Sequence, residues 1–133
     1  MKITFMGAGS TIFAKNVLGD CILNPTLGAF DIALFDIDPV RLTESADILD
    51  GINRKYGGKA TIKKYSDRLH ALDKADLVVN AIQVGGYEPC TVTDFEVPKK
   101  YGLRQTIADT LGIGGIFRAL RTIPVLEDFA ADM

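Results

Sequence analysis

The chain has 133 residues, of which 47% are hydrophobic and 24% are charged, a composition typical of one ordinary globular domain. A formal net charge of −2 and the absence of a basic run give no reason to expect nucleic acid or an anionic membrane surface as a partner. No apolar stretch is long enough to span a bilayer, and the opening Lys2–Met6 is too short for a signal peptide.

Two cysteines and one histidine limit the metal and disulfide chemistry of the chain. Cys21 and Cys90 are far apart and neither belongs to a Cys-x-x-Cys pair, so we interpret both as reduced structural thiols of a cytoplasmic protein. His70 alone cannot form a histidine metal cage, and we expect it to be an exposed helix residue. The sequence therefore predicts no metal site within this chain.

The first half of the chain alternates short strands with helices. Four strands are predicted, and the last is almost continuously apolar, which is typical of a parallel strand covered on both faces. The predicted strands span Lys2–Met6, Asp31–Asp36, Ala60–Tyr65 and Ala75–Ile82.

Helical patterns separate these strands. The first helix is predicted to end at Asn24-Pro25, and the second to begin at Pro39 and end at Gly57-Gly58. Ser66 is the predicted cap of a short third helix. The apolar sides of the three helices are formed by Phe13, Val17, Leu18, Cys21 and Ile22, then by Leu42, Ala46, Leu49 and Ile52, and then by Leu69 and Leu72.

Beyond the fourth strand we predict a loop, a helical stretch, a glycine-rich segment and a final helix. The loop covers Gln83–Pro89, the helical stretch lies near Thr93–Tyr101, and the glycines lie within Gly112–Gly115. The final helix is predicted to turn Ile116, Leu120 and Ile123 inward.

This order of elements predicts an α/β fold with a Rossmann-like parallel sheet and flanking helices, joined by right-handed crossovers. Such a fold has two halves, and the chain supplies one and a little more. We therefore expect the sheet to be truncated before its second half, and residues 1–133 to be one domain at the amino terminus of a longer protein.

A dinucleotide-binding turn is predicted where the first strand meets the first helix. Gly7 permits a tight turn, and Gly9 removes the Cβ that would keep a pyrophosphate away from the backbone. Ser10 opens the helix, where its hydroxyl and the free N–H groups are placed to bind phosphate oxygens. Ile12 stands where a third glycine is usual. The alternative is that both glycines only form a tight strand–helix turn.

Asp36 ends the second predicted strand, where a carboxylate accepts hydrogen bonds from the adenosine ribose hydroxyls. Its charge repels a 2′-phosphate, so the sequence favours NAD over NADP. Asp38 is an alternative to Asp36 in this role, or else the cap of the helix that begins at Pro39.

Two longer segments carry a family resemblance. Gln83–Pro89 and Thr106–Gly115 resemble the corresponding segments of the family 4 glycosidases, and most of all those of its α-galactosidases, or melibiases. The opening Gly7-Ala8-Gly9-Ser10 and the Asp36-Ile37-Asp38 segment match the same family. The resemblance covers essentially the whole chain, and Ile12 agrees with the family's version of the turn.

The resemblance implies an NAD- and Mn-dependent glycosidase. In this family, which departs from the usual two-carboxylate mechanism, NAD⁺ takes a hydride from C3 of the sugar and a base removes the proton at C2. A divalent metal stabilises the enediolate, the aglycone leaves, water adds, and the hydride returns. Members acting on 6-phosphorylated sugars carry an arginine after the fourth-strand loop. No Lys or Arg lies between Tyr87 and Val97, so the expected substrate is an unphosphorylated α-galactoside such as melibiose.

The resemblance also implies roles for single residues. Asp109 matches the acidic position that assists proton transfer beside the family's catalytic tyrosine, although alone it is a typical helix-capping or loop aspartate. The metal ligands and that tyrosine are expected downstream of Met133, so this chain alone should hold no Mn and turn over no sugar. A homo-oligomer is implied. The expected cofactor contacts are Gly7, Gly9, Ser10, Asp36, Gln83, Val84 and Gly85.

Other functions stay open at the level of sequence. A lactate- or malate-type NAD dehydrogenase would use the same turn but would reduce NAD⁺ stoichiometrically with a hydroxy acid. A non-catalytic NAD-binding domain would bind the cofactor without turnover. Within the family, an α-glucosidase or α-galacturonidase is an alternative, because the residues that read the sugar hydroxyls are not all present here.

Overall fold

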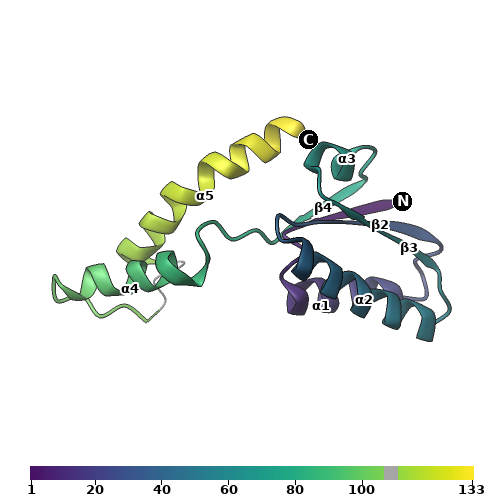
Figure 1. Ribbon diagram of the computed structural model, residues 1–133, viewed down its shortest axis with the longest axis horizontal. Helices are drawn as coiled ribbons and strands as arrows, with labels where there is room; N and C mark the ends of the chain where they lie inside the picture. Colours follow the sequence, from purple (N-terminus) through teal and green to yellow (C-terminus); the bar gives the residue numbers. More distant parts are fainter. Residues whose placement is uncertain (107–110) are drawn as a thin grey trace. The chain divides into compact units, whose positions relative to one another are not determined.

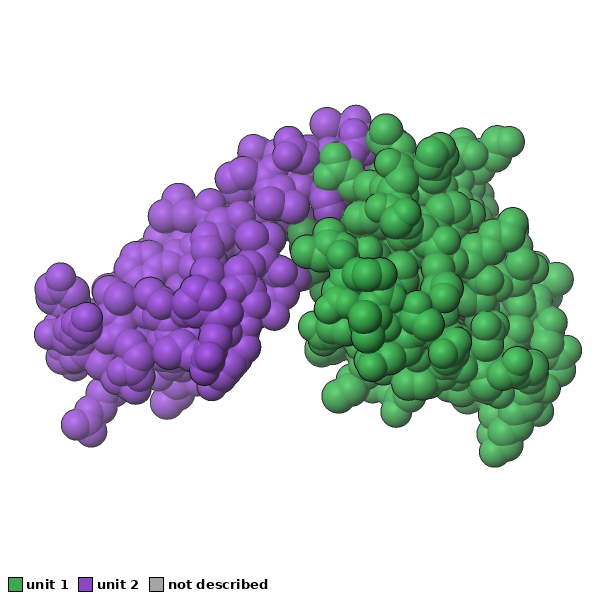
Figure 2. All heavy atoms as spheres, viewed as in Figure 1, with its two compact units in different colours: residues 1–82 green, residues 83–133 purple. Residues whose placement is uncertain are grey.

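The computed structural model describes residues 1–106 and 111–133, and the chain divides into two compact units. Unit 1 comprises Met1–Ile82 and unit 2 comprises Gln83–Met133, shown in green and purple in Figure 2. The interpretation of residues 1–133 as a single domain stays a prediction.

Unit 1 is built on a parallel sheet of four strands. These are β1 (Lys2–Met6), β2 (Phe30–Phe35), β3 (Ala60–Tyr65) and β4 (Leu77–Asn80). Their order across the sheet is β3-β2-β1-β4. Met6 pairs with Phe35 on one side and with Asn80 on the other, so three strands end together at one edge. The parallel order with flanking helices confirms the Rossmann-like α/β fold.

Helices cover both faces of this sheet (Figure 1). α1 (Thr11–Leu23) and α2 (Pro39–Lys55) lie side by side on one face, and the short α3 (Arg68–Leu72) lies on the other. The buried Thr4 hydroxyl of β1 donates a hydrogen bond of 2.8 Å to the carbonyl of Ala71, which ties α3 to its face. Pro39 begins α2 as predicted, and the helix ends just before the predicted stop at Gly57.

The core lies between the sheet and the α1/α2 layer. Alternate residues of β1 and β2 point into it and meet the buried stripes of the two helices. Burial of each large apolar side chain contributes about 1.5–3 kcal/mol, so this layer rigidly holds the edge where the strands end. The core consists mainly of Ile3, Phe5, Ala14, Leu18, Ile22, Ile32, Leu34, Leu42, Ala46 and Leu49.

α1 buries only part of the predicted apolar side: Leu18 and Ile22 are buried as expected, but Phe13 and Val17 are not. Phe13 and Val17 are 63% and 39% exposed, whereas Ala14, Leu18 and Gly19 are buried. Small residues allow α1 to approach α2 closely: a Cβ built on Gly19 would lie 3.8 Å from Ile52. Phe13 and Val17 are left outside this contact.

α3 is capped by Asp67 and not by Ser66, which corrects the prediction. The Asp67 carboxylate accepts a hydrogen bond of 2.8 Å from the backbone N–H of His70. An aspartate is at least as good a cap as a serine, so the helix begins one residue later than expected. His70 is exposed, as predicted, but Leu69 is 58% exposed and does not join the core.

β4 is shorter than predicted and is not covered on both faces. It spans Leu77–Asn80, and within the described residues it pairs with β1 alone. Leu77 is 55% exposed. The apolar run therefore forms an edge strand of the sheet described here.

Unit 2 is helical. Its elements are the π-helical segment η1 (Gly86–Thr91), then α4 (Val92–Lys99) and α5 (Gly112–Asp132). The segment predicted as a loop overlaps η1, but its backbone is not helical at Glu88, where φ is −106° and ψ is 132°, so regular helix begins only beyond this kink. The glycine-rich segment is the first turn of α5. Among the described residues, no helix is long and apolar enough to cross a bilayer.

The inward face predicted for α5 is wrong. Ile116, Leu120 and Ile123 are 58%, 70% and 50% exposed. Within unit 2, α5 packs on α4 and η1 through another side, which includes the buried Gly114 and the half-buried Arg121. Periodicity identifies an apolar face, but packing against neighbours decides which face is covered.

Candidate dinucleotide-binding site

The turn Gly7–Ser10 lies at the edge of the sheet where β1, β2 and β4 end. In open α/β sheets, ligands bind outside the carboxyl ends of the strands. The site is thus built from the turn, from Asp36 directly after β2, and from the first turn of α1.

Gly7 has the geometry that the sequence predicts for a tight turn. Its φ of +84° is a conformation that only glycine adopts readily. The N–H groups of Gly7 and Ala8 both donate to the carbonyl of Phe35, at 2.9 Å each. A Cβ on Gly7 would lie 2.6 Å from the carbonyl oxygen of Ala81, so no side chain fits here.

Gly9 is in direct contact with Asp36. The N–H of Gly9 donates to Asp36 Oδ2 at 2.6 Å, and a Cβ on Gly9 would lie 2.7 Å from that oxygen. The N–H of Asp38 donates to Asp36 Oδ1 at 2.9 Å. Two backbone donors thus fix the carboxylate and leave it with free lone pairs for further donors.

Asp38 caps α2. Its Oδ1 accepts hydrogen bonds from the N–H groups of Val40 and Arg41, at 2.9 and 3.1 Å. Of the two roles considered for Asp38, the cap is therefore confirmed. Asp36 is the carboxylate that faces the turn.

Ser10 occupies the N-cap position of α1 but makes no side-chain hydrogen bond to the first turn. Its backbone N–H is bonded to the carbonyl of Gly7, at 3.0 Å, and its side chain is half-buried. The hydroxyl is thus not committed to capping, which suits the predicted contact with a phosphate oxygen.

Ser45 also contacts the glycine turn, a role that was not predicted from the sequence. This α2 side chain is 1% exposed, and its hydroxyl donates to the carbonyl oxygen of Ala8 at 2.6 Å. Ser45 Oγ also lies 3.2 Å from Thr11 Oγ1. Ser45 stands between Leu42 and Leu49 on the buried stripe of α2, and a polar residue in that position was the available signal.

Gln83, Val84 and Gly85 belong to unit 2. Gln83 Nε2 donates to Thr91 Oγ1 at 3.2 Å. Gly85 has a φ of +92°, and a Cβ there would lie 2.4 Å from Cys90 Sγ. The loop is thus held closely against η1, and both cysteines of the chain are free thiols.

An ion pair between the buried Asp94 and the half-buried Arg121 lies beside Gly85 of this loop. Arg121 of α5 binds Asp94 of α4 through two hydrogen bonds, and its Nε lies 3.4 Å from the Cβ position of Gly85. The pKa of Arg121 is raised above its ordinary value, chiefly by the hydrogen bond to Asp94. The pair joins both helices beneath Gly85.

The remaining candidates are Asp109 and a metal-binding site. Asp109 lies outside the described residues. Among residues 1–106 and 111–133, no three His, Cys, Asp or Glu side chains are grouped so that they could hold a metal ion.

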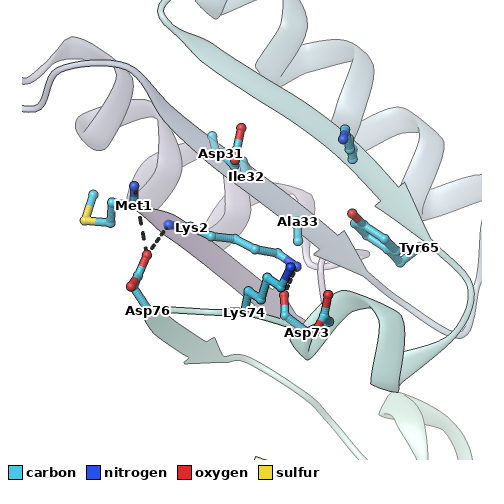
Figure 3. A pocket seen from close by; sticks show the side chains of 10 residues that line it. Met1, Lys2, Asp31, Ile32, Ala33, Tyr65, Asp73, Lys74 and Asp76 are labelled. Carbon is cyan, nitrogen blue, oxygen red and sulfur yellow. Dashed lines mark hydrogen bonds and ion pairs between the residues drawn. The ribbon is translucent and has the colours of Figure 1, made fainter.

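A cavity of about 340 Å³ lies elsewhere in unit 1 (Figure 3). Its lining includes Met1, Lys2 and Asp31, which lie at the amino ends of β1 and β2, away from the glycine turn. The Lys2 ammonium donates to the carbonyl of Asp73 at 2.6 Å and lies 5.4 Å from the ring centroid of Tyr65. Lys2 is thus already held by neighbouring groups.

Comparison with known proteins identifies the family. The model of the family 4 glycosyl hydrolases matches residues 2–133. The chain belongs to this family.

The sequence relatives within the family include α-galactosidases. An alpha-galactosidase of Bacillus subtilis (strain 168) is 65% identical over 132 residues, which cover 99% of this chain and 31% of that protein. An alpha-galactosidase of Rhizobium meliloti (strain 1021) is 35% identical over 132 residues, covering 99% of this chain and 27% of that protein. The chain thus spans less than a third of the length of these relatives.

A solved structure of another glycosidase shares the fold. A 6-phospho-alpha-glucosidase from gut microorganisms, in complex with NAD and Mn2+, matches with a TM-score of 0.84 at 20% identity. The match covers 98% of this chain and 29% of that one.

Proposed function

We propose that this chain is the NAD-binding part of a family 4 α-galactosidase that hydrolyses unphosphorylated α-galactosides such as melibiose. The observation that carries the proposal is the Gly9–Asp36 contact at the carboxyl edge of the sheet, in a chain 65% identical to an alpha-galactosidase. The whole protein's activity is proposed from this part because the chain spans 31% of that relative.

The described residues suit a dinucleotide. The turn leaves no room for a Cβ at Gly7 or Gly9, so it presents bare backbone beside the first turn of α1. The Asp36 carboxylate would accept hydrogen bonds from the adenosine ribose hydroxyls, and its negative charge favours NAD over NADP. Ser10 would bind a phosphate oxygen. Gln83, Val84 and Gly85 are proposed to contact the cofactor from the loop after β4.

When bound, NAD⁺ supplies a reversible hydride acceptor, which turns a sugar C–H bond into a site for oxidation. The chain's own contribution is to bind and orient the adenosine half. The fixed carboxylate of Asp36 selects the ribose, and the rigid turn sets the distance of the backbone from the diphosphate. Asp109 is proposed to assist proton transfer near the sugar.

The preference for an unphosphorylated sugar rests on charge. The segment between Tyr87 and Val97 contains no Lys or Arg, and Asp94 within it is already paired with Arg121. A sugar phosphate would therefore find no Lys or Arg within this segment to pair with its charge. A carbohydrate without a phosphate needs no such partner.

We further propose Mn²⁺ as the metal, with ligands downstream of Met133, and a homo-oligomeric, cytoplasmic enzyme. The metal is supported by the Mn2+ bound in the related 6-phospho-alpha-glucosidase. Two free cysteines support a reducing compartment.

A panel of p-nitrophenyl glycosides tests the specificity. The complete protein, supplied with NAD⁺ and Mn²⁺, is assayed on the α-galactoside, the α-glucoside, the α-galacturonide and 6-phospho-α-galactoside. We expect the highest kcat/KM on the unphosphorylated α-galactoside. A higher kcat/KM on the phosphorylated sugar, or on another glycoside, would overturn the proposed specificity, although the chain would still belong to family 4.

A further inference from the structure

One peptide group in the glycine turn is bound at both ends by side chains from distant parts of the chain. The carbonyl oxygen of Ala8 accepts a hydrogen bond of 2.6 Å from Ser45 Oγ. The N–H of Gly9, in the same peptide, donates to Asp36 Oδ2 at 2.6 Å. Asp36 follows β2 and Ser45 lies on α2, so the segment after β2 clamps the turn after β1.

The clamp controls the orientation of this peptide. In a trans peptide the C=O and N–H bonds point in opposite directions, so two partners on opposite sides fix the plane. Rotation of the Ala8–Gly9 peptide would break both hydrogen bonds at once. Ala8 is 0% exposed and Ser45 is 1% exposed, so water cannot easily replace the lost partner of the carbonyl.

Such control matters most next to glycine. Gly9 has no Cβ, so its backbone is intrinsically freer than that of any other residue. Without the hydrogen bond from Ser45, the peptide before Gly9 would be restrained through its N–H alone. The direction of that N–H in turn sets the position of the Asp36 carboxylate, whose second oxygen is held by Asp38.

Ser45 also reaches the start of α1. Its oxygen lies 3.2 Å from Thr11 Oγ1, and Thr11 is the first residue of the helix. The N–H of Thr11 is bonded to the carbonyl of Gly9 at 3.0 Å. One buried hydroxyl therefore joins the glycine turn to the first residue of α1, beside which the phosphates are proposed to bind.

We propose that Ser45 is a positioning residue for the dinucleotide: by holding the Ala8 carbonyl, it keeps the Gly9 N–H on Asp36 and so orients the carboxylate for the adenosine ribose. The inference rests on the proposed NAD site, and it adds a residue outside the glycine motif. Because Ser45 is 1% exposed, the proposed role is to position the turn and not to contact the cofactor.

The test compares two buried hydroxyls in the complete protein. Ser45→Ala removes the hydrogen bond to Ala8, whereas Thr4→Val removes the hydrogen bond from Thr4 to Ala71 on the opposite face of the sheet. Both variants lose one hydroxyl-to-carbonyl bond at a buried site. NAD⁺ and ADP-ribose affinities are measured by calorimetry at a temperature where circular dichroism shows both variants folded.

We expect Ser45→Ala to bind NAD⁺ and ADP-ribose roughly tenfold more weakly, an effect of the size of one lost hydrogen bond. The KM for NAD⁺ should rise while the KM for the galactoside keeps its value. Thr4→Val should retain the affinity for both nucleotides. Equal affinities of the two variants would overturn the positioning role.

A double-mutant cycle shows whether Ser45 acts through Asp36. In an Asp36→Ala background, the further change Ser45→Ala should weaken NAD⁺ binding by less than about twofold, since the group being oriented is gone. Full additivity would contradict the proposal.

Should Ser45→Ala not fold, Ser45→Cys, which keeps a weak donor of similar size, is expected to give an intermediate affinity. If the unchanged protein binds no NAD⁺, the proposed function itself fails.

Discussion

The Asp94 carboxylate and the Arg121 guanidinium form a two-point ion pair inside unit 2. Arg121 Nη1 and Nη2 lie 2.8 and 2.6 Å from the two carboxylate oxygens. Asp94 is 2% exposed, so its charge relies on this partner and not on water. The pair links α4 to α5 and stands behind Gly85, one of the proposed cofactor contacts.

Asp94→Asn should destabilise the protein, because it leaves the guanidinium without its counter-charge. We expect the melting temperature to fall by at least about 5 °C. Glu96→Gln is the matched control, since Glu96 forms an exposed pair with Lys99 on the same helix. Thermal unfolding followed by circular dichroism would show the difference. Equal losses in the two variants would mean that the buried pair has no special structural role.

Gly9→Ala should weaken NAD⁺ binding. The added Cβ would lie 2.7 Å from Asp36 Oδ2, so the carboxylate or the turn must move. A loss of affinity of at least about tenfold is expected. Gly28→Ala serves as the control because a Cβ there meets no atom within 4 Å. Unchanged NAD⁺ titrations for Gly9→Ala would argue against a cofactor site at this turn.

Asp36→Ala should change the choice between the two dinucleotides. Loss of the carboxylate removes both the ribose acceptor and the repulsion of a 2′-phosphate. The ratio of the Kd for NADP⁺ to that for NAD⁺ should fall about tenfold or more. Asp38→Ala, which removes only the α2 cap, should lower stability by about 1 kcal/mol and leave the ratio unchanged. The reverse pattern would assign the ribose to Asp38.

Cys21 should react slowly with alkylating reagents in the folded protein. Burial raises the pKa of its thiol, Asp20 raises it further, and Lys59 partly offsets the effect. Because the folded pKa lies above the unfolded value, the thiol contributes stability below the unfolded pKa. That contribution is lost as the pH rises through the folded pKa. At pH 8, iodoacetamide should label Cys21 several-fold more slowly than in urea-unfolded protein. Equal labelling rates by peptide mass spectrometry would refute the shift.

The strands and turns of unit 1 were largely readable from the sequence. β1 and β3 have the predicted bounds, and Pro39 begins α2, because local apolar runs and proline geometry determine these elements. Packing was less predictable. Phe13 and Val17 have the right spacing for a buried face, yet small residues govern the contact of α1 with α2.

The site was predictable where it follows a local motif. Gly7, Gly9 and Asp36 are brought together as the strand–turn–helix pattern requires. Ser45 could not be placed, because its partner Ala8 lies 37 residues away and depends on how α2 packs. Asp67 caps α3 in place of its neighbour Ser66. Serine and aspartate are both good helix caps, so capping propensities do not predict which of the two adjacent residues is used.

The central claim is most directly tested by hydrolysis of p-nitrophenyl α-galactoside by the complete protein, freed of bound nucleotide and supplied with Mn²⁺. Cleavage is expected only after NAD⁺ is added, with no net reduction of NAD⁺ as product accumulates. Cleavage at the same rate without NAD⁺ would contradict the role proposed for the glycine turn and Asp36. No cleavage in either condition would contradict the assignment as an α-galactosidase.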